Sequence, residues 1–135
     1  MKAEREQSAG RWLKQAEIDL EDAKYLFEGD RYHLVCFMSQ QASEKALKAY
    51  LYSQGVETVW GHSSSEHCTD VCRYDKGFLK LKHLATLLDT FYIPTRHPDA
   101  LPVGIPADAF AKEDAAKAIK ASSEIVEYIR SRIHS

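Results

Sequence analysis

The sequence has few of the residues that mark specialised classes of protein. It contains three cysteines, an odd number that cannot form a complete disulfide framework, so a reducing cytoplasm is the expected compartment. No apolar run approaches the roughly 18 residues that a membrane-spanning helix needs. The first residues also lack the apolar stretch of a secretory signal. We therefore expect a cytoplasmic protein that has no membrane partner.

An excess of charge of one sign is also missing. The chain carries 18 lysines and arginines against 20 aspartates and glutamates, a net charge of −2. This balance argues against a protein that holds nucleic acid by bulk electrostatics. With 135 residues, of which 44% are apolar, the chain is long enough to bury one hydrophobic core but too short for two. We expect a single domain over residues 1–135.

Apolar residues recur at helical spacing along most of the chain, and no segment shows the alternation of a strand. The pattern predicts an all-α fold: an up-and-down antiparallel bundle of four main helices plus one short helix. The expected main helices are residues 8–28, 31–54, 77–91 and 112–133, and the short one is 63–74.

The second expected helix is apolar around most of its circumference, which is typical of a helix that is central to a bundle or shared with a second subunit. Two adjacent glutamines, Gln40 and Gln41, interrupt its apolar surface. Buried amides need hydrogen-bond partners, so we expect an interhelical network or, as the alternative, the polar edge of a binding groove. Glu44 and Lys48 are spaced for an ion pair on one helix face.

A long proline-rich loop precedes the last helix, and all four prolines lie within residues 93–106. We expect no helix there, because proline removes a backbone donor and restricts its neighbour. Arg96, His97 and Asp99 bring a cation, an imidazole and a carboxylate together just after Tyr92. A stiff loop with this composition suits a phosphate or nucleotide site. The structural alternative is that Arg96 caps a helix end or pairs with Asp99.

Other chemistries find little support. Imidazoles and thiols cluster around residues 62–72, but only one cysteine pair is present and it lies on a predicted helix, so we expect no metal site and no cofactor. Cys36 sits among apolar residues and is expected to be an inert core residue. The sequence contains no glycine-rich phosphate loop of either standard type.

Four segments, in order and spanning nearly the whole chain, resemble the HEPN domain family. They are Trp12-Leu13-x-x-Ala16-x-x-Asp19-Leu20-x-x-Ala23, Cys36-Phe37-x-x-Gln40-Gln41-Ala42-x-Glu44-Lys45-Ala46-Leu47-Lys48-Ala49, Gly61-His62-Ser63 and Tyr92-Ile93-Pro94-Thr95-Arg96-His97-Pro98-Asp99-Ala100. The resemblance implies a helical bundle that commonly forms a homodimer. Small prokaryotic members are often encoded beside a minimal nucleotidyltransferase, and the two can act as a toxin–antitoxin pair.

Toxic members of this family resemble metal-independent ribonucleases that carry an arginine, four to six intervening residues, and a histidine. The histidine would move the proton of a ribose 2′-hydroxyl while the arginine stabilises the charge on phosphorus. This sequence departs from the pattern, since Arg96 adjoins His97 and only three residues separate Arg130 from His134. In the loop, His97 stands where the family more often has tyrosine.

The resemblance without this spacing favours a non-catalytic HEPN protein, a dimer that binds a nucleotide, a nucleotidyltransferase partner or both. The alternative is a metal-independent endoribonuclease toxin that cuts RNA with Arg96 and His97 or with Arg130 and His134. The residues expected to bind the nucleotide or partner are Gln40, Gln41, Lys45, Lys48, His62, Tyr92, Arg96 and Asp99.

Overall fold

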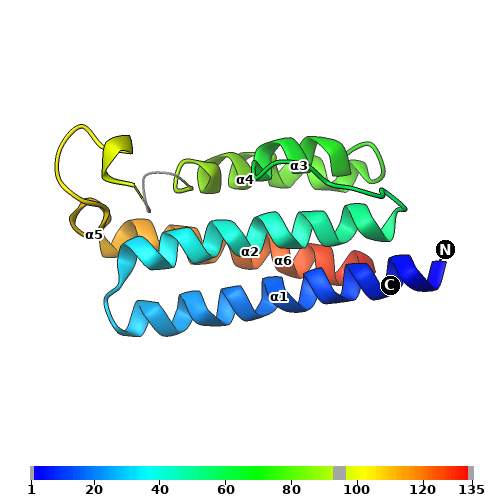
Figure 1. Cartoon of the computed structure of the whole chain (residues 1–135), viewed down its shortest axis with the longest axis horizontal. Coiled ribbons are helices and arrows are strands. Elements are labelled where there is room, and N and C mark those ends of the chain that lie inside the picture. The colour runs from blue at the N-terminus through cyan, green and yellow to red at the C-terminus, as the bar shows by residue number, and fades with distance from the viewer. Residues whose placement is uncertain (1, 93–96, 134–135) are drawn as a thin grey trace.

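The computed structural model describes residues 2–92 and 97–133, and within these ranges it contains helices and no strand (Figure 1). The α-helices are α1 (Lys2–Glu28), α2 (Tyr32–Ser53), α3 (Ser64–Val71), α4 (Lys82–Asp89), α5 (Pro106–Ala109) and α6 (Lys112–Ile133). Two 3₁₀ helices, η1 (Lys76–Leu81) and η2 (Pro98–Ala100), precede α4 and α5. The predicted all-α class is confirmed.

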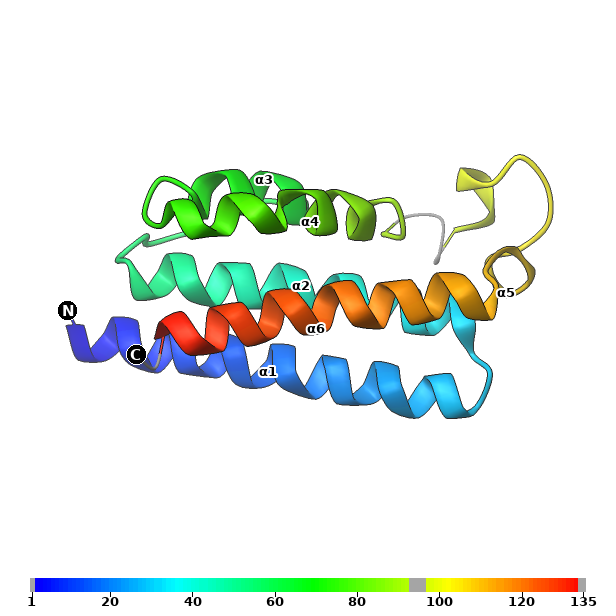
Figure 2. The ribbon, with the colours of Figure 1, turned by 180° about the vertical axis from the view of Figure 1, so that it is seen from behind.

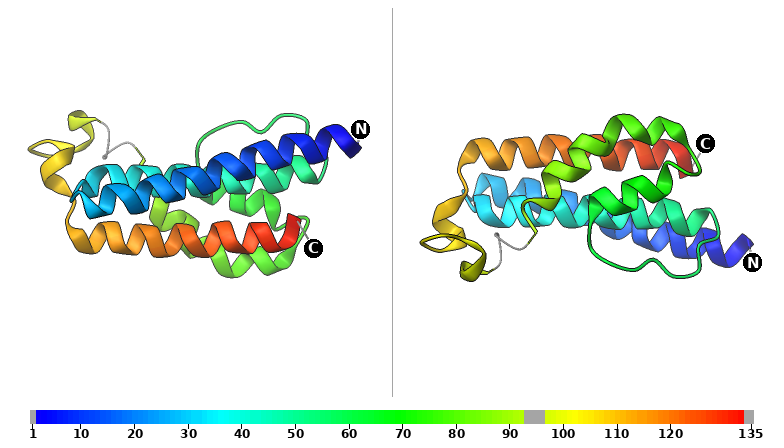
Figure 3. Two further views of the ribbon diagram at one scale, coloured as in Figure 1. Left: turned by 90° about the horizontal axis from the view of Figure 1, so that it is seen from below. Right: turned by 90° about the horizontal axis from the view of Figure 1, so that it is seen from above.

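Helix α2 occupies the centre of the bundle and packs against α1, α6, α3 and α4. α1 and α6 lie along one side of it, and α3 with α4 form a layer along the other (Figures 1 and 2). α1 and α4 run in one direction and α2 and α6 in the opposite one, as the two views of Figure 3 show. No described helix is long and apolar enough to cross a membrane.

The central position of α2 explains why it is apolar on nearly every side. Its residues Ala42, Ala46 and Ala49 are fully buried, and side chains this small let neighbouring helices approach closely. Val35 and Leu47 are fully buried as well. Most of the wide apolar arc is therefore accounted for within a single chain, although Leu34 near the start of α2 remains 37% exposed.

Two of the main helices differ from the sequence-based prediction. α1 begins at Lys2 rather than residue 8, because residues 2–7 favour helix although they add nothing to the apolar stripe. The predicted helix 77–91 is divided into η1 and α4, and the side chain of Asp75 caps the start of η1 by accepting a hydrogen bond from the Gly77 amide (2.8 Å).

The prediction that residues 93–106 contain no helix is wrong for part of that segment. η2 begins at Pro98 and α5 begins at Pro106. Proline is tolerated in the first turn of a helix, where its missing amide would have had no partner. Both short helices lie at the end of the bundle where α1 meets α2 (Figure 1).

Candidate functional site

The entry to α3 is fixed by a carboxylate from α4. Both oxygens of Asp89 accept hydrogen bonds at the start of α3: Oδ2 from Ser63 Oγ (2.8 Å) and the Ser65 amide (2.8 Å), and Oδ1 from the Ser64 amide (2.7 Å). Ser63 Oγ in turn accepts from the Glu66 amide, which completes the N-cap. These bonds also fix the position of the residue just before the cap, His62.

Three contacts hold His62 against the bundle. Its ring stacks on Tyr92, with 5.5 Å between centroids and 12° between planes. Its Nδ1 lies 3.3 Å from Glu44 Oε2, and its carbonyl accepts a hydrogen bond from Gln40 Nε2 (3.0 Å). The side chain remains 62% exposed and lines a shallow hollow of about 340 Å³ with Ser63, Asp89 and Tyr92. One edge of the imidazole therefore faces solvent while the other is fixed.

Below His62 lies a buried ion pair on α2. Lys48 Nζ is 3.1 Å from Glu44 Oε2, and the two side chains are only 8% and 3% exposed. The second carboxylate oxygen of Glu44 has no hydrogen-bond partner within the described part of the chain.

Burial lowers the pKa of the nearby His67, and the Lys48 ammonium lowers it further, so this imidazole is neutral at pH 7. We call Glu44, Lys48, His62 and Tyr92 the His62 cluster.

A wider groove runs beside this cluster between α1 and α2. It encloses about 520 Å³ and is lined by Ser8, Arg11, Trp12, Gln15 and Lys45; we call it the α1–α2 groove. The Lys48 ammonium lies 5.3 Å from the centre of the Trp12 ring, so this contact joins the groove to the cluster.

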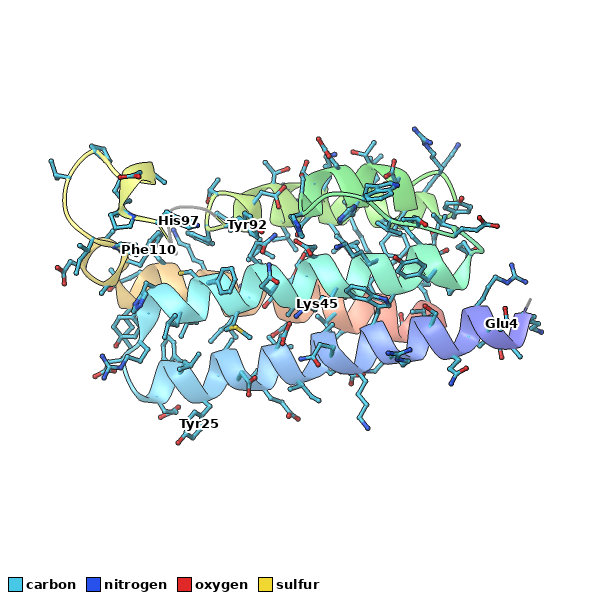
Figure 4. The ribbon with its side chains drawn as sticks, viewed as in Figure 1. Glu4, Tyr25, Lys45, Tyr92, His97 and Phe110 are labelled. Atoms are coloured by element: carbon cyan, nitrogen blue, oxygen red, sulfur yellow. The ribbon has the colours of Figure 1, made fainter. Side chains whose placement is uncertain are left out.

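Lys45 marks the side of the groove that α2 supplies (Figure 4). Its Nζ is 2.6 Å from Asp19 Oδ2, and Gln15 Nε2 donates to Asp19 Oδ1 (2.9 Å). The groove thus combines the Trp12 ring, which stacks on Tyr52, with the cation of Arg11 and with a lysine and an amide that both bond to Asp19. An aromatic edge beside a cation can contact a planar ring and an anionic group.

The structure brings six of the predicted binding residues to one side of α2: Gln40, Gln41, Lys45, Lys48, His62 and Tyr92. The glutamines form hydrogen bonds, but not the interhelical network that was predicted: Gln41 Nε2 donates to Gln40 Oε1 (2.8 Å), and Gln40 Nε2 donates to the His62 carbonyl (3.0 Å). This carbonyl belongs to a loop rather than a helix. Because Gln40 is fully buried, its hydrogen bond to the His62 carbonyl holds the loop before α3 against α2.

The loop and C-terminal candidates lie elsewhere. Asp99 is exposed on η2 and His97 is exposed just before it. Arg130 Nη2 and Nε donate to Glu17 Oε2 on α1 (2.8 and 3.2 Å). This pair joins α6 to α1 and engages the guanidinium. Arg96 and His134 lie outside the described residues.

Arg11 and Trp12 line the groove but were not among the predicted binding residues. Trp12 immediately precedes the buried Leu13 on α1. A cation and an aromatic residue side by side at the edge of an apolar helix stripe, as Arg11 and Trp12 are, can indicate a binding surface. The pattern does not tell which residues of α2 they face. Only the packing of α1 on α2 sets Lys45 and Lys48 beside Trp12.

The described residues include no group of three or more histidine, cysteine, aspartate or glutamate side chains placed to hold a metal ion. Cys36 and Cys68 are buried and Cys72 is partly exposed, and all three thiols are free. Desolvation raises the pKa of the Cys36 thiol to about 12 and that of the Cys68 thiol to about 12. The expected inert character of Cys36 follows from this burial.

These pKa shifts predict selective labelling. At pH 8 a thiol of pKa about 12 is thiolate in roughly one molecule in 10,000, so an aromatic disulfide reagent should modify Cys72 first and the two buried thiols only on unfolding. The measurement is the absorbance of the released thiolate in buffer and in urea. Cys72→Ser should remove the fast phase, whereas a fast phase that survives this substitution would contradict the assignment.

Comparison with known proteins shows one family over almost the whole chain. The model of the HEPN domain matches residues 9–132. TT1696 from Thermus thermophilus has a similar crystal structure, with a TM-score of 0.86, 33% identity, and 91% of this chain and 96% of that chain covered. ST0689, an archaeal HEPN homologue, is 37% identical with a TM-score of 0.77, covering 93% of this chain and 97% of that one.

A third structure, of a HEPN domain protein from Thermotoga maritima, is 28% identical with a TM-score of 0.73, and 92% of this chain and 98% of that chain are covered. No curated protein matches the sequence.

Proposed function

Because the chain belongs to the HEPN domain family, we propose that it is a non-catalytic helical bundle that binds a nucleotide in the α1–α2 groove. The observation that carries the proposal is the groove's composition. Trp12, whose ring stacks on Tyr52, borders the hollow with an aromatic edge. Arg11 places positive charge there, and Lys45 adds an ammonium that it shares with Asp19. A nucleotide presents the matching features, a planar base and anionic phosphates.

The neighbouring His62 cluster adds groups that suit the remainder of such a ligand. The exposed edge of His62 can donate to a phosphate oxygen, or donate to or accept from a ribose hydroxyl. Lys48 is buried and paired with Glu44, so it supports this surface from below and adds no net charge. The overall charge of −2 does not oppose this binding, because the contacts are local and the ligand is small.

Titration of the purified protein with ATP, GTP and their monophosphates by calorimetry tests the proposal. We expect saturable binding, and Trp12→Leu and Arg11→Gln should each weaken it by about tenfold, the effect of losing one stacking or charge-assisted contact. Lys14→Gln is the matched control, since Lys14 is exposed on α1 and does not line the groove. No heat with any nucleotide at millimolar concentration would refute the site.

Absence of catalysis is part of the same proposal. Arg130 already bonds to Glu17, so its guanidinium is not directed at a substrate. RNA incubated with the protein in chelator should therefore stay intact. Cleavage that is lost in Arg130→Ala would favour the ribonuclease alternative instead.

We further propose that the protein forms a homodimer and pairs with a minimal nucleotidyltransferase in a toxin–antitoxin-type system. Support for self-association comes from an apolar groove of about 420 Å³ at the end of the bundle, formed by α2, η2 and α5. Leu34 and Ile105 line it and are 37% and 50% exposed. Exposed apolar surface of this kind is typical of interaction sites.

Sedimentation at micromolar concentration should show a dimer. Leu34→Asp together with Ile105→Asp should convert it to a monomer, because each places a charge in the buried contact. Leu79→Asp is the control, since Leu79 is 67% exposed on η1 and does not line this groove. A wild-type monomer would contradict self-association, and co-purification with the product of a neighbouring nucleotidyltransferase gene would test the partner separately.

A further inference from the structure

A separate hollow of about 280 Å³ lies between the loop that follows α2 and the end of α3. Its apolar lining includes Leu51, Val56 and Val59. Two aromatic residues, Trp60 and Tyr74, also line it. Trp60 is 83% exposed and Tyr74 is 49% exposed, and within the described residues no aromatic ring stacks on either. None of these side chains belongs to the His62 cluster or the α1–α2 groove.

The same hollow is lined by one charge of each sign. Asp70 lies in the last turn of α3 and Arg73 lies two residues past its end, with Asp70 Oδ1 4.0 Å from Arg73 Nη2. Their side chains are 47% and 77% exposed. An exposed ion pair at this distance contributes little to stability. Little free energy is therefore lost when Asp70 and Arg73 each bind a charged group of a ligand instead of each other.

We propose that this hollow binds a free α-amino acid with a large apolar side chain, such as phenylalanine or leucine. The ammonium would bond to Asp70 and the carboxylate to Arg73, whose planar guanidinium suits a carboxylate. The side chain would displace water from the apolar lining and contact Trp60 and Tyr74. This site is independent of the proposed nucleotide groove.

Charge favours this ligand over a nucleotide. The carboxylate of Asp70 repels phosphate, whereas a zwitterion carries two opposite charges close together, as Asp70 and Arg73 do. The lining is also mainly apolar apart from this pair and Thr58. A ligand of about a dozen heavy atoms in such a shallow site should bind with a Kd on the order of 1 mM.

Fluorescence of Trp60 provides the test. The chain has two tryptophans, so Trp12→Phe leaves Trp60 as the sole reporter and removes any signal from the α1–α2 groove. L-phenylalanine should change the emission saturably, whereas phenethylamine and 3-phenylpropionate, which each lack one charge, should bind about tenfold more weakly. AMP serves as the competing class of ligand.

Substitutions of Arg73 and Asp70 test which charged group of the ligand each residue binds. Arg73→Gln should weaken L-phenylalanine binding to the affinity of phenethylamine and leave the affinity for phenethylamine unchanged. Asp70→Asn should weaken L-phenylalanine binding to the affinity of 3-phenylpropionate and leave the affinity for 3-phenylpropionate unchanged. Both residues are on the surface, so circular dichroism should show an intact fold. The proposal is overturned by a linear response up to about 20 mM, by AMP binding more tightly than L-phenylalanine, or by variants that do not discriminate among the ligands.

Discussion

Replacing Glu44 by leucine should lower the free energy of unfolding by about 3–5 kcal/mol, the usual cost of leaving a buried charge without its partner. The Lys48 side chain is only 8% exposed, and its ammonium donates an ion-pair hydrogen bond to Glu44 Oε2 at 3.1 Å. The cation–π contact with Trp12 is too weak to replace that carboxylate. Urea unfolding followed by circular dichroism would measure the change.

Two further variants distinguish the cost of an unpaired buried charge from the cost of changing the side chain's packing. In the double variant Glu44→Leu with Lys48→Met both charges are absent, so most of the stability should return. Glu44→Gln retains an oxygen that Lys48 and His62 can bond to, so its effect should be smaller than that of leucine. If Glu44→Leu alone costs less than about 1 kcal/mol, the range of an exposed pair, the pair is not buried in solution.

The second large effect is expected from Asp89→Ala, at about 2–3 kcal/mol, because it removes a carboxylate that accepts three hydrogen bonds at a helix N-terminus. The Ser64 and Ser65 amides would be left without their partners, and α3 would lose one of its attachments to α4, keeping the hydrogen bonds from Lys82 and Thr86 to Ser65. Thermal and urea unfolding would both report the loss.

Asp99→Ala is the matched control for this variant, since Asp99 is an exposed aspartate in η2 and should change stability by less than about 0.5 kcal/mol. Asp89→Asn preserves one oxygen acceptor and should give an intermediate value. Because Asp89 holds the residues next to His62, Asp89→Ala should also weaken nucleotide binding in the titration described above. Equal stability of the two alanine variants would show that Asp89 does not anchor α3.

The ion pair on α2 could be predicted from the sequence because it depends on helical spacing. Glu44 and Lys48 are four residues apart, and any helix would set them on one face. The need of Gln40 for a buried partner was likewise predictable from its apolar surroundings. Its actual partner, the His62 carbonyl, is 22 residues away and could not be inferred from local spacing.

Contacts between residues far apart in the sequence were not predicted, because local spacing does not reveal them. Arg130 is a good example: sequence placed it with His134 on the last helix, but packing of α6 against α1 gives it Glu17, which is 113 residues away. The stacking of His62 on Tyr92 also joins two distant segments. The proline-rich segment misled the prediction in another way, since the position of each proline within a turn, and not the number of prolines, decides whether a helix can start.

The all-α class and the resemblance carried by the four segments could be read from the sequence, because 3.6-residue periodicity and local motifs are properties of neighbouring residues. For the second helix the sequence left two positions open, central to the bundle or shared with a second subunit, and the packing of the chain placed it at the centre. Tertiary structure alone decided which charges are buried, that Trp12 and Lys45 share a groove, and that Asp89 anchors the helix after His62. Those features depend on contacts between helices far apart in the chain, whose relative positions are set by packing of the whole core rather than by any local pattern.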